Sequence, residues 1–152
     1  AALAAVPPPP ARTPSASGPP EGFFVYGTLR PDDNSGAAWT KEFCEGMTPE
    51  AAQLSGASIY VTGSFPSLCL EQTRCTVRGV LLVAGDSAVM QAKLASADKI
   101  EGYPDLYDRT VATVQTASGA ARRAYVYHRT GRIEREEYAR ILDGDWMSRP
   151  AT

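Results

Sequence analysis

The stretch KIEGYPDLYDRT, residues 99–110, joins the end of a predicted helix to the start of a predicted strand. The helix spans residues 86–102, because Asp86 or Ser87 can cap its N-terminus and Gly102 can end it. One narrow stripe along this helix, with spacings of four, three and four residues, consists of Met90, Leu94, Ala97 and Glu101. The pattern therefore directs a carboxylate toward the core at the last turn.

A carboxylate on the buried face of a helix has three physical interpretations. Burial disfavours the charged form and would raise the pKa of Glu101 toward neutrality, which suits general acid–base catalysis. Arg109, or another arginine, could instead pair with Glu101 and give it a structural role. A glutamate at a helix end could also extend its carboxylate to solvent. Periodicity alone does not choose among these.

The other predicted elements are mainly short strands around this helix. Alternating and β-rich segments, separated by glycine and other turn residues, identify them. They are a strand entering a loop at 22–30, a short helix at 37–46, a strand with a glycine bulge at Gly56 over 52–63, a strand at 77–85, a hairpin of 106–116 and 122–130, and a late helical turn at 134–142. Several unequal strands with one main helix predict an α+β domain with a closed or nearly closed sheet.

Composition favours one globular domain and gives little support for nucleic-acid or membrane binding. The chain has 152 residues, of which 43% are hydrophobic, and a net charge of −2. Lysine and arginine form no block, and no apolar run is long enough to cross a bilayer. Residues 1–20 are rich in proline and alanine and predict a flexible tail, which leaves residues 21–150 for the domain.

The cysteines and the histidine give no pattern typical of metal binding or nucleophilic catalysis. Cys44, Cys69 and Cys75 are an odd number without CxxC spacing, which predicts neither a disulfide framework nor a zinc site. They favour a reduced, cytoplasmic setting. His128 is the single histidine, so a histidine-based metal cluster is not expected, and no convincing Ser-His-Asp or Cys-His set is found.

Two motifs resemble those of the γ-glutamylcyclotransferase-like family. They are FVYGTLRPDDN, residues 24–34, and IEGYPDLYDR, residues 100–109, in the family's order. ILDGDW, residues 141–146, resembles the ending of its small, bacterial-type members, and the likeness covers about residues 22–147. The resemblance implies a small mixed closed β-barrel with flanking helices, in keeping with the α+β prediction. It also implies release of 5-oxoproline from γ-glutamyl compounds without a metal or an organic cofactor.

The resemblance also implies roles for individual residues. The family's acid–base carboxylate corresponds to Glu101, and a tyrosine that lines its site corresponds to Tyr107. The loop that holds the γ-glutamyl group, largely through its backbone, corresponds to Tyr26, Gly27, Thr28 and Leu29. Further candidates, each with a structural role as the alternative, are Arg30, Asn34 and Arg109. Trp146, at the end of ILDGDW, is expected to be a packing anchor that closes the barrel, and Tyr125 and Tyr127, on one strand face, are expected to be core or cavity-wall residues.

These residue types suit a reaction in which the substrate supplies its own nucleophile. Its α-amine attacks its γ-carbonyl, a five-membered ring forms, and an amine leaves. One carboxylate with a raised pKa can take and return the proton, while loop N–H groups bind the oxyanion. The resemblance therefore implies a cyclotransferase acting on a γ-glutamyl amine or γ-glutamyl peptide. A monomer or weak homodimer is expected. A non-catalytic small-molecule-binding or regulatory domain with the same cavity is the alternative.

Overall fold

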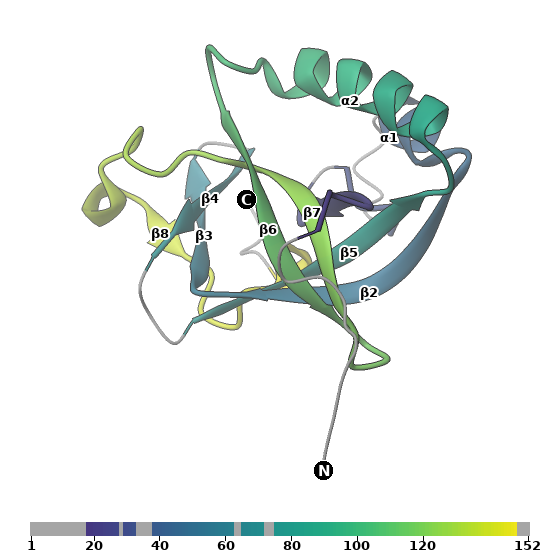
Figure 1. Ribbon diagram of the computed structural model, residues 1–152. Coiled ribbons are helices and arrows are strands. Elements are labelled where there is room, and N and C mark those ends of the chain that lie inside the picture. The colour runs from purple at the N-terminus through teal and green to yellow at the C-terminus, as the bar shows by residue number, and fades with distance from the viewer. Residues whose placement is uncertain (1–17, 28, 33–37, 63–64, 72–74, 149–152) are drawn as a thin grey trace, which may run out of the picture.

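The computed structural model describes residues 18–27, 29–32, 38–62, 65–71 and 75–148. Most of the predicted tail, residues 1–17, lies outside this part of the chain. The described residues form a closed mixed β-barrel, with a smaller sheet beside it and helices packed on it (Figure 1). This architecture confirms the predicted α+β fold with a closed barrel and flanking helices.

Five strands of the described chain close the barrel in the order β1-β5-β2-β6-β7 (Figure 1). Their bounds are Gly22–Val25 for β1, Met47–Ser55 for β2, Thr76–Ala84 for β5, Asp108–Thr116 for β6 and Ala121–His128 for β7. Neighbouring strands pair antiparallel, except that β1 and β7 pair in parallel and close the sheet. Because these two strands run in the same direction, the residues that follow each of them leave at the same mouth of the barrel.

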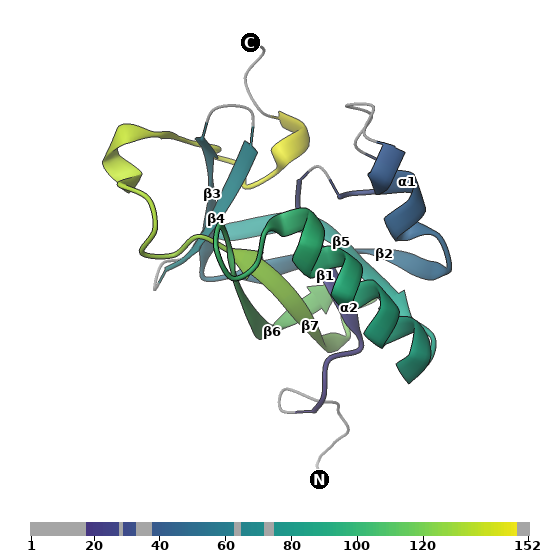
Figure 2. The same ribbon diagram turned by 90° about the horizontal axis from the view of Figure 1, so that it is seen from above.

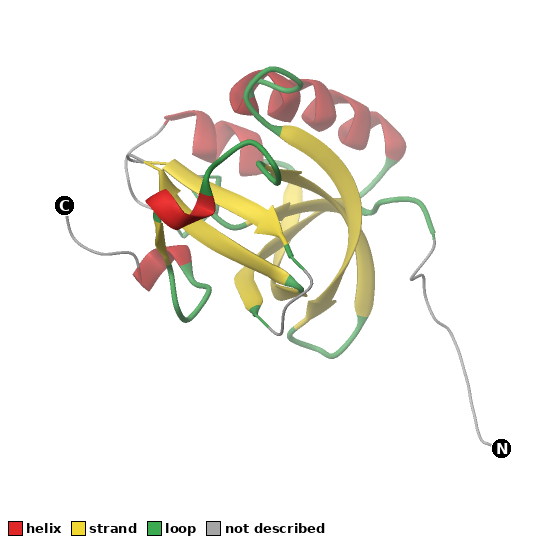
Figure 3. Ribbon diagram, turned by 90° about the vertical axis from the view of Figure 1, so that its left-hand side faces the viewer, coloured by secondary structure: helices red, strands yellow, loops and turns green. Residues whose placement is uncertain are grey.

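The second sheet corrects the prediction of one continuous strand over 52–63. Gly56 has a φ of 77° and separates β2 from β3, Ala57–Thr62, so it is not a bulge within one strand. β3 pairs with β4, Phe65–Leu70, and with the short β8, Ala139–Arg140, in a sheet separate from the barrel (Figure 3). The left-handed backbone at Gly56 turns the chain out of the barrel, and β4 is an element that the sequence did not predict.

Two helices of the described chain lie on one side of the barrel (Figure 2). α1 spans Ala38–Cys44 and α2 spans Ser87–Glu101. A carboxylate oxygen of Asp86 accepts a hydrogen bond from the Val89 amide at 2.9 Å, and Gly102 ends α2 with a φ of 71°. Both predicted ends of this helix are thus confirmed. No helix among the described residues is long and apolar enough to span a membrane.

Alternation along β1 divides the core into two clusters. Phe24 packs in a cluster shared by the barrel strands and the second sheet, whereas Phe23 packs in a cluster shared with the helices. Trp146 is 1% exposed in the first cluster and belongs to a 3₁₀ turn, Trp146–Ser148. It anchors the C-terminal segment, as predicted. An earlier 3₁₀ turn, Arg135–Glu137, lies within the late helical turn predicted for 134–142, but that prediction was wrong for Ala139–Arg140, which form β8 and pair with β3.

Candidate active site

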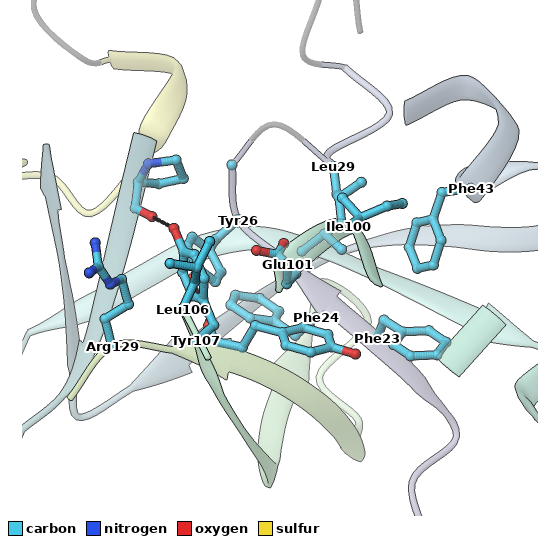
Figure 4. Close-up of a pocket in the computed structure, with 14 residues that line it drawn as sticks. Phe23, Phe24, Tyr26, Leu29, Phe43, Ile100, Glu101, Leu106, Tyr107 and Arg129 are labelled. Atoms are coloured by element: carbon cyan, nitrogen blue, oxygen red, sulfur yellow. Dashed lines mark hydrogen bonds between the residues drawn. The ribbon is translucent and has the colours of Figure 1, made fainter. Parts of the chain in front are cut away.

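A cavity of about 240 Å³ lies where the ends of β1, β7 and α2 meet (Figure 4). Aromatic and aliphatic side chains form most of its wall, and its charged lining residues are Glu101 and Arg129. The parallel pairing of β1 and β7 explains why the loop after β1 reaches the same mouth as the residues after β7. A mostly apolar cavity with a few polar groups is typical of small-molecule sites.

Glu101 projects into this cavity from the last residue of α2 (Figure 4). The earlier residues of its helical stripe are buried or half-buried, so the periodicity carries the carboxylate inward as predicted. Among the described residues, none forms a hydrogen bond or an ion pair with this carboxylate. Burial raises the pKa of Glu101 to about 7. The carboxyl group can therefore both accept and donate a proton near neutral pH.

A second carboxylate, one turn earlier on α2, binds the arginine that could have paired with Glu101. Asp98 accepts hydrogen bonds from the Arg109 guanidinium and from the Tyr127 hydroxyl, the latter at 2.6 Å. The Arg109 guanidinium also lies 4.3 Å from the centre of the Tyr103 ring. Arg109 thus fixes the end of α2 to the barrel and does not line the cavity. Because Arg109 pairs with Asp98, it does not pair with Glu101.

Three tyrosines line the cavity, and the hydroxyl of each one donates a hydrogen bond. Tyr26 donates to the carbonyl oxygen of Tyr127 at 2.6 Å, and Tyr107 donates to that of Pro66 at 2.7 Å. Burial raises the pKa of Tyr107 to about 12, and the nearby Glu101 charge contributes to the increase. Burial also raises the pKa values of Tyr26 and Tyr127, so these hydroxyls stay protonated at neutral pH.

The loop after β1 supplies one side of the cavity. Tyr26, Gly27 and Leu29 line it, while the role in substrate binding that the resemblance implied for them stays a prediction. Thr28 and Asn34, two other candidates, lie outside the described residues. The site therefore combines a loop from one end of the chain with Glu101 from α2.

Arg30, a further candidate, is buried but does not line the cavity. Its guanidinium forms ion pairs with Asp32 at 2.6 Å and with Asp145 at 2.9 Å. Asp145 belongs to the ILDGDW segment and directly precedes the buried Trp146. Arg30 therefore anchors the loop to the C-terminal segment.

A comparison with models of protein families shows to which family the chain belongs. The model described as "Gamma-glutamyl cyclotransferase, AIG2-like" matches residues 23–148. The chain belongs to this family. The match spans the loop after β1, all of α2 and the ILDGDW segment, and it supports a cyclotransferase type of function in general.

Solved structures with a similar fold come from animals, archaea and bacteria. An AIG2-like protein from Mus musculus has a TM-score of 0.56 and 21% identity, covering 87% of this chain and 85% of its own. An uncharacterised protein from Pyrococcus horikoshii has a TM-score of 0.55 and 19% identity, and the match covers 82% of this chain and 87% of the Pyrococcus chain. The protein ytfP from Escherichia coli has a TM-score of 0.51 and 23% identity, and the match covers 83% of this chain and 96% of the ytfP chain. These likenesses establish the fold, and a search of curated proteins found no match.

Gly27, in the loop matched by the family model, allows the loop to pack against β4. A Cβ atom at Gly27 would lie 2.3 Å from Cγ of Pro66, whose carbonyl oxygen accepts the Tyr107 hydrogen bond. We therefore expect Gly27→Ala to lower the free energy of unfolding by about 1–2 kcal/mol, as measured by urea denaturation. Gly85→Ala is the matched control, since a Cβ there meets nothing within 4 Å. A Gly27→Ala protein as stable as this control would contradict the packing argument.

Part of the cavity wall was missed by reasoning from the sequence. Pro66 comes from β4, the unpredicted strand, and Phe43 comes from α1. Of Tyr125 and Tyr127, which the sequence left as core or wall, Tyr127 lies in the wall, whereas Tyr125 does not line the cavity and packs against the core cluster shared with the helices. Arg129 follows it by two residues, and this strand period was an available signal that both side chains point the same way.

Proposed function

We propose that the protein releases 5-oxoproline from a γ-glutamyl amine or γ-glutamyl peptide, with Glu101 as the acid–base group. The observation that carries this proposal is the Glu101 carboxyl group, which has a raised pKa and lies in a mostly apolar cavity without a partner among the described residues. Family membership supports a cyclotransferase in general, and the specific reaction is our proposal.

The proposed reaction needs no nucleophile from the protein. The α-ammonium group of the substrate gives a proton to Glu101, and the resulting amine attacks the γ-carbonyl carbon. The new C–N bond closes a five-membered lactam, and the bond to the leaving nitrogen breaks. The lactam keeps one of the three ammonium protons, while the other two end on the leaving nitrogen, which departs as an ammonium group. Glu101 carries these protons between two nitrogens that share one carbon in the tetrahedral intermediate.

The rest of the cavity acts on geometry and charge. Its aromatic walls hold the glutamyl arm folded, which removes much of the entropy cost of ring closure. Backbone amides of the loop that contains Gly27 and Leu29 bind the α-carboxylate and stabilise the developing oxyanion. In this proposal the reaction uses neither a metal nor an organic cofactor, and the protein acts in the cytoplasm as a monomer or weak homodimer.

A small-molecule-binding or regulatory domain with the same cavity is the alternative. Such a domain would gain nothing from a buried carboxylate without a partner, because desolvating the charge reduces stability. Glu101 therefore favours the enzyme over the binding domain.

The test is to measure 5-oxoproline release from a panel of γ-glutamyl amines, γ-glutamyl dipeptides and glutathione. α-Glutamyl dipeptides serve as controls, since they lack the γ-linked leaving group. We expect release from at least one γ-linked substrate and none from the α-linked controls. Absence of release from every substrate, by protein shown to be folded by circular dichroism, would reject the enzyme and support the binding domain.

A further inference from the structure

The carboxylate of Asp98 connects α2 to two strands of the barrel, one helical turn before Glu101. It forms an ion pair with Arg109 of β6 and accepts a hydrogen bond from the Tyr127 hydroxyl of β7 at 2.6 Å. Tyr127 also lines the cavity that contains Glu101. The ion pair therefore lies beside the site and outside the cavity wall.

The Arg109 guanidinium is held by one carboxylate and two aromatic rings. Within the described part of the chain, Asp98 is the carboxylate with which Arg109 forms an ion pair. The guanidinium lies 4.3 Å from the centre of the Tyr103 ring and 5.5 Å from that of Tyr125. An aromatic ring attracts a cation less strongly than a carboxylate does in direct contact. Loss of the Asp98 charge would therefore release Arg109 toward another carboxylate.

Glu101 is the acidic group best placed to receive the released guanidinium. Side chains three positions apart on a helix have Cβ atoms about 5–6 Å apart, so Glu101 lies next to Asp98 on the surface of α2. A buried carboxylate without a partner is costly, and pairing with a cation offsets part of that cost. The arginine that Asp98 binds could thus also pair with Glu101.

The other groups that face Glu101 in the cavity do not replace Arg109 as its partner. The loop after β1, the segment before β6, and β7 with the residues after it contribute Tyr26, Tyr107, Tyr127 and Arg129. The three tyrosine hydroxyls donate elsewhere, and the arginine forms no ion pair with Glu101. α1 and β4 contribute Phe43 and Pro66, which do not titrate. Arg109 is therefore the nearby cation whose position depends on the choice between two carboxylates.

We propose that Asp98 is a positioning residue, which holds Arg109 away from Glu101 and so keeps the Glu101 carboxyl group available to exchange protons with a substrate. This inference rests on the proposed function, since it states what protects the acid–base group of that reaction. Asp98 acts through Arg109 and touches no reacting atom. Its role is to win the competition between two carboxylates for one guanidinium.

The variant that tests this role is Asp98→Asn. Asparagine keeps an oxygen that can accept the Tyr127 hydrogen bond, but it lacks the charge that holds Arg109. We expect Arg109 to pair with Glu101 and to move the inflection of the kcat/KM pH profile from about 7 to lower pH, by about one to three pH units. The plateau of kcat/KM above the inflection should fall by about tenfold or more, because the paired carboxylate is a weaker base.

Removal of the arginine as well should reverse both effects. In Asp98→Asn/Arg109→Gln, the inflection should return to about 7 and kcat/KM to within about threefold of the wild type. Arg109→Gln alone should leave the inflection at or above that of the wild type, since the remaining Asp98 charge opposes ionisation of Glu101. A lower inflection in Arg109→Gln would overturn the proposal, whatever the behaviour of Asp98→Asn.

A purely structural ion pair gives a different pattern. Both single variants would then lose activity with an unchanged inflection, and the double variant would not recover, which would overturn the proposal. The matched control is Glu21→Gln, which removes the acidic partner of Arg122 in an ion pair of 3.0 Å whose two residues do not line the cavity. We expect the control to keep the wild-type pH profile. Circular dichroism establishes that each variant is folded.

A ¹³C NMR titration of the Glu101 carboxyl group separates this inference from the proposed function. The signal is assigned by its absence in Glu101→Gln, and the titration needs neither substrate nor activity. A lower pKa of Glu101 in Asp98→Asn that recovers in the double variant would uphold the inference even where no 5-oxoproline is released. Release of 5-oxoproline with the same Glu101 pKa in Asp98→Asn and the wild type would leave the proposed function standing and reject the inference.

Discussion

Replacement of Glu101 by glutamine should lower kcat by about two to four orders of magnitude, the contribution expected of a positioned acid–base group. Glutamine occupies nearly the same volume and keeps the neutral character that the cavity favours, but it cannot accept the ammonium proton. We therefore expect KM to change only a few-fold. The measurement is 5-oxoproline release by the wild type and Glu101→Gln on the best substrate of the panel.

The pH dependence of the same reaction gives an independent check. Because the reaction begins with the Glu101 carboxylate as base, kcat/KM of the wild type should rise as pH increases through about 7, the pKa to which burial raises this group. Residual activity of Glu101→Gln should lack this inflection. The exposed Glu136 provides the control, and Glu136→Gln should behave as the wild type. Equal rates in Glu101→Gln and the wild type would remove Glu101 from the acid–base role.

The features that the sequence predicted correctly depend on local geometry. The ends of α2 follow from the Asp86 cap and from Gly102, and the inward direction of Glu101 follows from the helical period. The hairpin of β6 and β7 follows from alternation around a short turn. Each of these properties is determined by residues close together in the chain, which is why a pattern can reveal it.

The features that the sequence left open depend on distant partners. Arg30 and Arg109 were candidates for the site because a sequence does not show which carboxylate an arginine meets. Arg30 meets Asp145 across 115 positions, and Arg109 meets Asp98 rather than Glu101. The break at Gly56 was missed for a similar reason, since a glycine bulge and a crossover to another sheet have the same local pattern. Family resemblance, rather than periodicity, connected the loop after β1 with Glu101.

The contribution of Glu101 to the stability of the wild type should fall as pH rises from about 4.5 to about 7, and Glu101→Gln should lack this contribution. Burial raises the pKa of Glu101 from its ordinary value of 4.5 to about 7. Between these values the folded state binds more protons than the unfolded state, so deprotonation favours unfolding. The contribution is fully present below pH 4.5 and is lost as pH passes through 7. A shift of this size corresponds to about 3 kcal/mol at most.

Urea denaturation of both proteins between about pH 4 and pH 9 measures this effect as a difference between two curves. Groups common to both proteins, including His128, whose pKa is lowered by burial, largely cancel in that difference. We expect Glu101→Gln to gain stability relative to the wild type with increasing pH and to reach a plateau above about pH 8. A difference independent of pH would mean that the carboxylate stays solvated. The predicted result would show that the unpaired Glu101 carboxylate lowers the stability of the wild type at neutral pH. Such a destabilising group is expected where an acid–base function requires a carboxyl group without a partner in the cavity.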